Sequence, residues 1–188
     1  MKKMMRNAHG FTLIELLIVV AIIGIIAAIA VPGLLRARMS GNEASAIGSE
    51  RAINSAQSTY ASSCANGNYA QALSDLILPP AGSAAGFVSP DLDPAINKGV
   101  AAGSVSKSGY EVVLGPGLTA APVVLAANTC NGSKNDALPT YYAAATPNKV
   151  GSTGQRSFGT DQRGTVYQDM TGALFTAATV NTANNPIQ

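Results

Sequence analysis

The most prominent feature of the sequence is an apolar block that runs from Phe11 to Val31 and is interrupted by only two polar residues, Thr12 and Glu15. At about 1.5 Å per residue, a helix of this length covers roughly 30 Å, the thickness of the hydrocarbon layer of a bilayer. A helix that is apolar on every face needs lipid or protein on all sides. The pattern therefore predicts a transmembrane helix over residues 11–35.

Beyond this block the apolar positions narrow to one stripe at helical spacing. The stripe consists of Met39, Ala46, Ile53, Ala56 and Tyr60. This spacing predicts that the helix continues as an amphipathic half over residues 36–62. We expect the polar side chains of this half to lie mostly off the stripe, facing solvent or a neighbouring subunit. These side chains are Glu43, Glu50, Arg51 and Gln57.

Residues 63–188 are rich in small and turn-forming residues and predict a separate β-rich domain. We expect a short helix over residues 69–78 and a loop over residues 81–108. The strand candidates are residues 110–114, 123–127, 141–145, 156–160 and 165–168. Asp161 and Gly164 occupy the first and fourth positions of a type I turn, which predicts a hairpin between the last two strands. The expected fold class is α+β, with a long N-terminal helix packed on a small antiparallel sheet.

A short basic leader precedes the apolar block. Residues 1–10 contain Lys2, Lys3 and Arg6 and end in Gly10. An ordinary secretory signal would carry its small-residue cleavage site after the apolar region, and residues 28–32 offer only an imperfect one. The basic leader favours a cytoplasmic N-terminus, although two arginines just after the span, at positions 36 and 38, weaken the charge contrast.

The sequence Gly10-Phe11-Thr12-Leu13-Ile14-Glu15, with its basic leader and apolar run, resembles the class III signal sequence of type IV pilins and pseudopilins. The resemblance covers Met1 to about Tyr60. It implies a pilin-like fold and cleavage by the prepilin peptidase between Gly10 and Phe11, followed by methylation of the new amine. It also implies a homo-oligomeric filament built through the N-terminal helix by an assembly machinery in the inner membrane.

The isolated acid Glu15 supports the same interpretation on physical grounds. A carboxylate in bilayer hydrocarbon costs about 2.5 to 3.5 kcal/mol on insertion scales, so it needs a compensating partner. Cleavage would create an α-amine on Phe11, close enough to pair with Glu15 of the same subunit or of an axially displaced neighbour. The alternative is a Glu15 that is protonated or extends to the membrane interface.

Gly24 and Pro32 bracket the part of the helix that is easiest to open. Pro32 lacks an amide hydrogen and crowds the preceding turn, so we expect a kink there. The family resemblance implies that residues 24–31 lose helicity when the filament assembles. An equally weighted alternative is that Gly24 and Ala28 simply allow another helix to approach closely.

The two cysteines, Cys64 and Cys130, lack the spacing and the histidine partners of a metal site, so in an exported domain they predict one disulfide. Two unpaired buried thiols are the alternative.

Because the single histidine is His9, within the leader, the processed chain has no histidine for catalysis or metal binding. Two acids in a Pro-rich loop, Asp91 and Asp93, fall short of a calcium site. Asn131 begins an N-glycosylation triplet.

The formal charge is +2, and three of the twelve basic side chains lie in the leader. The remaining ones are scattered, so we expect no nucleic-acid partner. We expect no enzymatic activity, no cofactor and no metal. The six that lie in residues 63–188 are Lys98, Lys107, Lys134, Lys149, Arg156 and Arg163.

The sequence therefore predicts a structural subunit of a type IV pilus, serving adhesion, motility or DNA uptake. The precursor would be a single-pass inner-membrane protein with a cytoplasmic N-terminus, and the product an extracellular filament. The alternative is a pseudopilin of a type II secretion system, in a periplasmic pseudopilus. Major pseudopilins of that kind tend to have a Trp-containing calcium region, and this chain has no Trp. A membrane-tethered monomeric binding protein is a third possibility.

Overall fold

The computed structural model of the protein describes residues 10–119 and 124–187. The chain divides into two compact units, Met1–Ala37 and Arg38–Gln188, and each is described by itself. Helix α1 (Leu13–Ser63) contributes its first part to the first unit and the remainder to the second. The second unit contains all the other helices and strands of the described residues.

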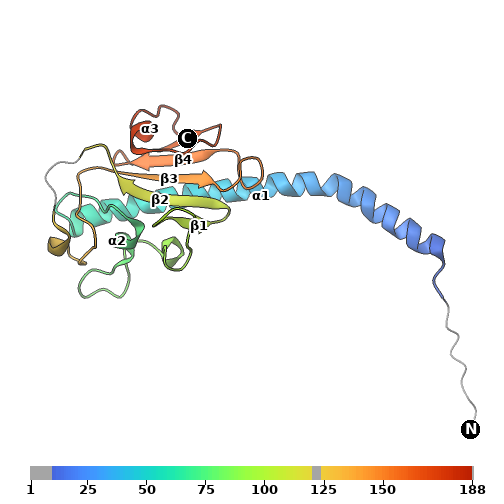
Figure 1. The fold of residues 1–188 in the computed structure, drawn as a ribbon, viewed down its shortest axis with the longest axis horizontal. Helices are drawn as coiled ribbons and strands as arrows, with labels where there is room; N and C mark the ends of the chain where they lie inside the picture. Colours follow the sequence, from blue (N-terminus) through green and yellow to red (C-terminus); the bar gives the residue numbers. More distant parts are fainter. Residues whose placement is uncertain (1–9, 120–123, 188) are drawn as a thin grey trace, which may run out of the picture. The chain divides into compact units, whose positions relative to one another are not determined.

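The second unit is built on a five-stranded sheet (Figure 1). The strands follow one another in sequence order and each pairs antiparallel with the next, so the sheet is a simple meander. They are β1 (Val105–Lys107), β2 (Tyr110–Pro116), β3 (Tyr141–Pro147), β4 (Ser157–Asp161) and β5 (Val166–Asp169). The short helices are α2 (Leu73–Ile77), η1 (Pro90–Leu92), η2 (Ala126–Asn128) and α3 (Ala177–Asn181).

The α+β class is confirmed, and four of the five predicted strands are present. The predicted hairpin between β4 and β5 closes with a hydrogen bond from Gly164 N–H to Asp161 O (2.9 Å). The predicted strand over residues 123–127 is wrong, because the described part of it has only a single bridge, Val124 to Ala137, and then enters η2. The predicted loop over residues 81–108 is wrong at its end, where three residues form β1 on the edge of the sheet.

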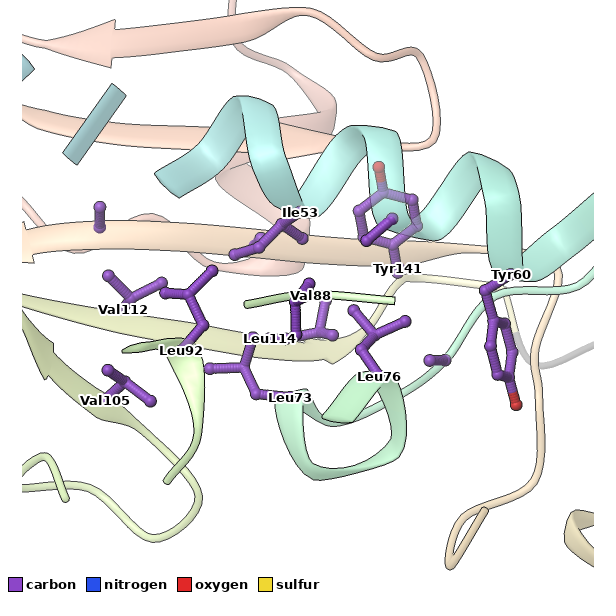
Figure 2. Close-up of a cluster of buried hydrophobic side chains, with 14 of the residues drawn as sticks. Ile53, Tyr60, Leu73, Leu76, Val88, Leu92, Val105, Val112, Leu114 and Tyr141 are labelled. Atoms are coloured by element: carbon purple, nitrogen blue, oxygen red, sulfur yellow. The ribbon is translucent and has the colours of Figure 1, made fainter. Parts of the chain in front are cut away.

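The amphipathic half of α1 packs on one face of the sheet, as the heptad spacing predicted. Ala46, Ile53 and Tyr60 are 3%, 0% and 0% exposed and belong to one core cluster. Alternate residues of the strands face them, including Val112 and Leu114 (Figure 2). Complete burial of a side chain such as Ile53 contributes about 1.5 to 3 kcal/mol, so this helix face carries much of the core energy.

The buried face of α1 is wider than the predicted apolar stripe. Glu43, Glu50 and Gln57, expected mostly on the polar face, are 8%, 0% and 0% exposed. They recur every seven residues beside the apolar stripe and form what we call the polar column. Arg51 is exposed, as expected. The prediction failed because polarity was taken as a sign of solvent exposure, whereas Glu43 and Gln57 are buried against groups of the domain that they bind.

Two members of the polar column fasten α1 to other segments. Gln57 exchanges two hydrogen bonds with the backbone of Ala70, at 2.8 Å and 2.9 Å. Glu43 accepts backbone N–H bonds from Gln155 and Arg156 and forms an ion pair with the Arg156 guanidinium at 2.7 Å. Burial raises the pKa of the Glu43 carboxyl, but the bonds from Gln155 and Arg156 outweigh burial and hold that pKa below its ordinary value.

The opposite face of the sheet is partly covered by α3 and the segment before it. Phe175 and Val180 pack there in a second, smaller cluster with Ala144 and Tyr167. Gly159 of β4 permits this contact, because a Cβ at that position would stand 2.7 Å from Phe175 and 2.8 Å from Val180. The sheet is therefore buried over part of both faces.

Neighbouring segments cover both edges of the sheet. The C-terminal segment runs antiparallel to β5, with hydrogen bonds from Gln168 N–H to Asn185 O (3.0 Å) and from Ile187 N–H to Val166 O (2.9 Å). At the other edge, Ser106 N–H of β1 donates to Asn97 O (2.9 Å). Covering the edge strands in this way removes a template for uncontrolled strand pairing.

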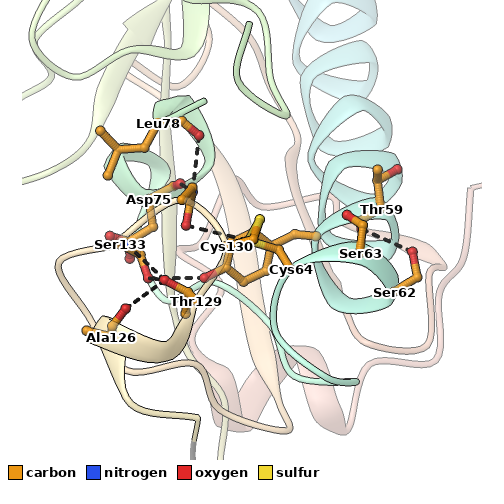
Figure 3. Close-up of a disulfide and its surroundings, with 12 residues drawn as sticks. Thr59, Ser62, Ser63, Cys64, Asp75, Leu78, Ala126, Thr129, Cys130 and Ser133 are labelled. Atoms are coloured by element: carbon orange, nitrogen blue, oxygen red, sulfur yellow. Dashed lines mark hydrogen bonds between the residues drawn. A yellow bond between two sulfur atoms is a disulfide. The ribbon is translucent and has the colours of Figure 1, made fainter. Parts of the chain in front are cut away.

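A disulfide closes the far end of the helix. Cys64 directly follows α1 and is joined to Cys130, with 4.6 Å between the Cα atoms, so the expected bridge is present (Figure 3). Near it, Asp75 accepts hydrogen bonds from Lys134 N–H (3.0 Å) and the Asn135 side chain (2.9 Å). The bridge and these bonds tie the loop around residue 130 to α1 and α2.

We predict that replacing both cysteines by serine lowers the free energy of unfolding by roughly 4 kcal/mol, because the sequence separation of 66 residues gives a large loop-closure entropy. Urea unfolding of the full chain in detergent micelles, with and without the double substitution, measures this. An unchanged unfolding midpoint would show that the bridge contributes nothing.

We predict that Glu43→Gln lowers the free energy of unfolding by about 2 kcal/mol at neutral pH, because it removes a buried charge-assisted contact with Arg156. The folded pKa of Glu43 is depressed, so its contribution is present above the ordinary value of about 4.3 and is lost as the pH falls through the folded value. The free energies of unfolding of wild type and variant should therefore become equal in acid.

The double variant Glu43→Gln with Arg156→Gln should lose little more free energy of unfolding than either single variant, since both substitutions remove the same interaction. Urea titrations at neutral and acid pH test both statements. If Glu43→Gln lowered the free energy of unfolding equally at neutral and acid pH, the assigned role of the ion pair would be contradicted.

Candidate processing and assembly site

The predicted cleavage point lies just before α1 in an open segment. Gly10 and Phe11 precede Leu13, the first residue of the helix. Phe11 is 87% exposed, and a Cβ placed on Gly10 would meet nothing within 4 Å. A peptidase can bind such a segment without first unfolding a helix. The leader residues 1–9, including the basic side chains and His9, lie outside the described residues.

Glu15 turns back toward the start of the helix and forms a capping box with Thr12. The Thr12 N–H and hydroxyl donate to Oε2 of Glu15 at 2.9 Å and 2.7 Å, and the Glu15 N–H donates to the Thr12 hydroxyl oxygen at 3.3 Å. This arrangement satisfies backbone donors that a helix leaves free at its first turn. It also holds the carboxylate at the positive end of the helix dipole, beside the residue that would carry a new α-amine.

Thr12 is the one residue of this site that the sequence reasoning missed. A threonine followed three positions later by glutamate, just before an apolar run, is the sequence signature of a capping box. The partner predicted for Glu15 was the α-amine that cleavage would create on Phe11. The structure shows that it also has a local partner, so the acid is not left without hydrogen bonds when the helix stands alone.

The first part of α1 exposes its apolar side chains on all sides. From Leu13 to Leu35 every large apolar residue is at least 42% exposed, and none of the most apolar part of the helix is buried. By length and composition this helix can cross a membrane. The exposed side chains are an extensive surface that water disfavours and that lipid or other helices would cover.

The helix is continuous through Gly24 and Pro32. Pro32 removes one backbone hydrogen bond from the helix interior, and a Cβ on Gly24 would meet nothing within 4 Å. The structure therefore contains a helical segment between these two positions. Its opening on assembly stays a prediction.

The acids considered for calcium are engaged in other contacts. Asp91 forms a salt bridge with Lys107 and accepts a hydrogen bond from the Ser89 hydroxyl, whereas Asp93 accepts the backbone N–H of Ala95 at 2.8 Å. Within residues 10–119 and 124–187, no group of three or more His, Cys, Asp or Glu side chains is arranged to hold a metal ion. These acids organise their loop.

Asn131 is also used within the fold. Its side-chain amide donates to Asp75 O at 2.7 Å and to Leu78 O at 3.1 Å, on the α2 side of the disulfide. A glycan on that nitrogen would have to break this contact. Asn131 therefore has a structural role that the triplet pattern did not indicate.

Three of the scattered basic side chains are paired with acids. Lys107 pairs with Asp91, Arg156 with Glu43, and Arg163 with Asp161. Arg163 also lies over the ring of Tyr167, with 4.8 Å between the guanidinium carbon and the ring centroid. These pairs reduce the free positive charge on the domain.

Comparison with known proteins identifies the N-terminal segment. Residues 5–31 match the family described as the prokaryotic N-terminal methylation motif. The chain is 67% identical over 39 residues to the type IV wide pilus major component PilA4 of Thermus thermophilus, covering 21% of this chain and 30% of the relative. It is 46% identical over 52 residues to the type IV major pilin protein PilA of Myxococcus xanthus, covering 28% of this chain and 24% of the relative.

The alignments thus span a third or less of either relative, and no solved structure matches the chain. The matched motif contains Gly10, Phe11 and Glu15 together with the apolar run. The downstream α+β domain has the pilin-like arrangement of a long helix packed on an antiparallel sheet. These findings show that the N-terminal segment carries the prokaryotic N-terminal methylation motif, and that over a short stretch the chain is similar to two type IV pilins.

Proposed function

We propose that this protein is a structural subunit of a type IV pilus that is cut between Gly10 and Phe11 and assembled through its N-terminal helix. The observation that carries the proposal is an exposed helix, apolar on every side, that begins with a capped acid at Glu15. A soluble enzyme or binding domain has no use for such a helix, since it would aggregate in water. Lipid would cover the apolar side chains of this helix before assembly, and neighbouring helices of a bundle would cover them afterwards.

In the precursor, residues 11–35 would cross the inner membrane once, with the N-terminus in the cytoplasm where the prepilin peptidase and the assembly machinery act. In the filament the same residues would form the core with other copies of this chain. Residues 36–62 would link that core to the domain formed by residues 63–188, which would face outward. The names of the two relatives, both major components of type IV pili, support this assignment.

The charge at Glu15 would direct assembly. Cleavage at Gly10 places a new ammonium on Phe11, one residue before the capping box. The carboxylate costs about 2.5 to 3.5 kcal/mol in lipid, so an ammonium from an incoming subunit stabilises the docked position relative to the lipid-bound one. Before assembly, Thr12 offsets only part of the cost of placing the Glu15 carboxylate in lipid, since its two hydrogen bonds both end on one carboxylate oxygen.

The segment between Gly24 and Pro32 would be the part of the packed helix that loses its helical structure. Its helix lacks one backbone hydrogen bond at Pro32, and glycine at position 24 has the conformational freedom to leave the helix. Opening there would let a filament lengthen under load without separating its subunits.

A pseudopilus of a type II secretion system is the second candidate, because the methylation motif is shared by pilins and pseudopilins. Its assembly would also bury the apolar helix among other helices and pair Glu15 with the ammonium on Phe11. Electron microscopy of the assembled product separates the two, since a pilus is a long surface filament and a pseudopilus is a short periplasmic one.

We predict that Glu15→Ala is processed normally but enters filaments at least tenfold less well than wild type when both are expressed together, because the incoming ammonium loses its partner. Filaments sheared from cells and analysed by mass spectrometry give the ratio of the two subunits.

Thr12→Val serves as the matched control. It removes the hydroxyl of the capping box and leaves both Glu15 and the new amine in place, so it should assemble close to the wild-type level. Equal incorporation of Glu15→Ala and wild type would defeat the charge-pairing hypothesis. A loss in Thr12→Val as large as that in Glu15→Ala would show that the contact within one subunit is the important one.

A further inference from the structure

One member of the polar column, Glu50, has no polar partner. It is 0% exposed, and neither of its carboxylate oxygens has a hydrogen-bond partner among the described residues. The core residues Ala46 and Ile53 lie about one turn of α1 to either side of it. Its column neighbours Glu43 and Gln57 are both bonded to the domain, so Glu50 is the unfastened position in the middle of the packed helix.

The cations of the surrounding elements are already paired. Arg156, before β4, is held by Glu43, Arg163, after β4, by Asp161, and Lys107 of β1 by Asp91. On α1 itself the adjacent Arg51 is exposed and points away from the buried face. None of these groups is bonded to Glu50, so in the described part of the chain no positive charge is paired with an ionised carboxylate at this position.

The other ionisable groups near this interface are acids and phenols. Tyr141 of β3 is close enough to Glu50 for a negative charge there to raise the Tyr141 pKa, and its hydroxyl donates to Asn54 Oδ1 (2.8 Å). Tyr110 of β2 donates to Arg156 O (2.7 Å). Asp75 of α2 is satisfied by Lys134 N–H and the Asn135 side chain. These groups offer Glu50 no compensation, and negative charge on any of them would disfavour its ionisation.

We propose that Glu50 is a proton-dependent release point between α1 and the sheet. As a neutral acid it packs within the core, and as an anion it must reach water, which means separating the helix from the sheet between two fixed ends. Those ends are the Glu43 to Arg156 ion pair on one side and, on the other, the two hydrogen bonds between Gln57 and Ala70 together with the Cys64 to Cys130 disulfide. The helix would loosen in the middle and remain attached.

The sign of the effect follows from proton linkage. Burial raises the pKa of Glu50 well above its ordinary value. The unfolded chain releases this proton near pH 4.3, whereas the folded chain keeps it, so the stability of the domain falls as the pH rises above about 4.3. For one proton, the ratio of folded to unfolded chains falls about tenfold per pH unit until the folded pKa is reached. This direction is opposite to that expected for Glu43.

The test uses the full chain in detergent micelles and does not depend on filament formation, so its failure would leave the proposed pilus function untouched. Urea unfolding is measured from about pH 5 to about pH 8 for wild type, Glu50→Gln and Glu50→Leu. We expect the folding equilibrium constant of each variant, relative to wild type, to rise by up to about tenfold per pH unit. Taking this ratio cancels the titration of every other group.

Glu111→Gln is the matched control, because Glu111 is a partly exposed acid of β2 that accepts hydrogen bonds from Ala101 N–H and the Ser104 hydroxyl. It should keep the wild-type pH dependence. A Glu50→Gln protein with the same pH dependence as wild type would overturn the proposal.

A second measurement remains valid if the variants fold poorly. Infrared spectroscopy of the Glu15→Gln chain with isotope-labelled glutamate, in which Glu15 cannot contribute, should show the carbonyl band of a protonated carboxylic acid at neutral pH, where exposed glutamates are ionised. Loss of the band and of helix protection in hydrogen exchange at the same higher pH would support the release point. Absence of the band at neutral pH would overturn it.

Discussion

The structure depends on one helix that must satisfy two environments. Up to Leu35 its large apolar side chains are exposed on all sides and need lipid or other helices around them, while from Glu43 onward one face is buried against a sheet. The hydrophobic effect therefore acts on the two parts differently. It excludes the first part from water and fastens the second part to its own domain. The change from one pattern to the other lies close to the boundary between the two compact units at Ala37.

The second part of the helix is held by more than apolar contact. The polar column and the cysteine that continues it at the same spacing attach α1 to three distant segments, through Arg156, Ala70 and Cys130. Such contacts specify one register of the helix on the sheet, because a shift along the helix axis would break all of them together. In the proposed filament, a subunit pulled by its helix would transmit the load to the domain through these attachments.

Much of this arrangement could be predicted from the sequence, because its main signals are periodic. The seven-residue spacing of Ile53 and Tyr60 indicated the buried face, and Asp161 with Gly164 indicated the last hairpin. What the sequence could not show was which polar side chains find buried partners. Gln57 and Glu43 meet groups 13 and more than 100 residues away, and no local pattern reports contacts at such separations. Strand β1 was missed because three residues in a Gly- and Ser-rich stretch carry too weak an alternation.

The central claim is that the apolar helix is exposed at its N-terminus by processing and then buried by assembly with identical helices. Mass spectrometry of the N-terminus of this protein, recovered from filaments sheared off the cell surface, tests both steps at once. The account predicts a chain that begins with N-methylated Phe11. A chain that begins at Met1, or one cut near Pro32 and lacking the apolar helix, would contradict it.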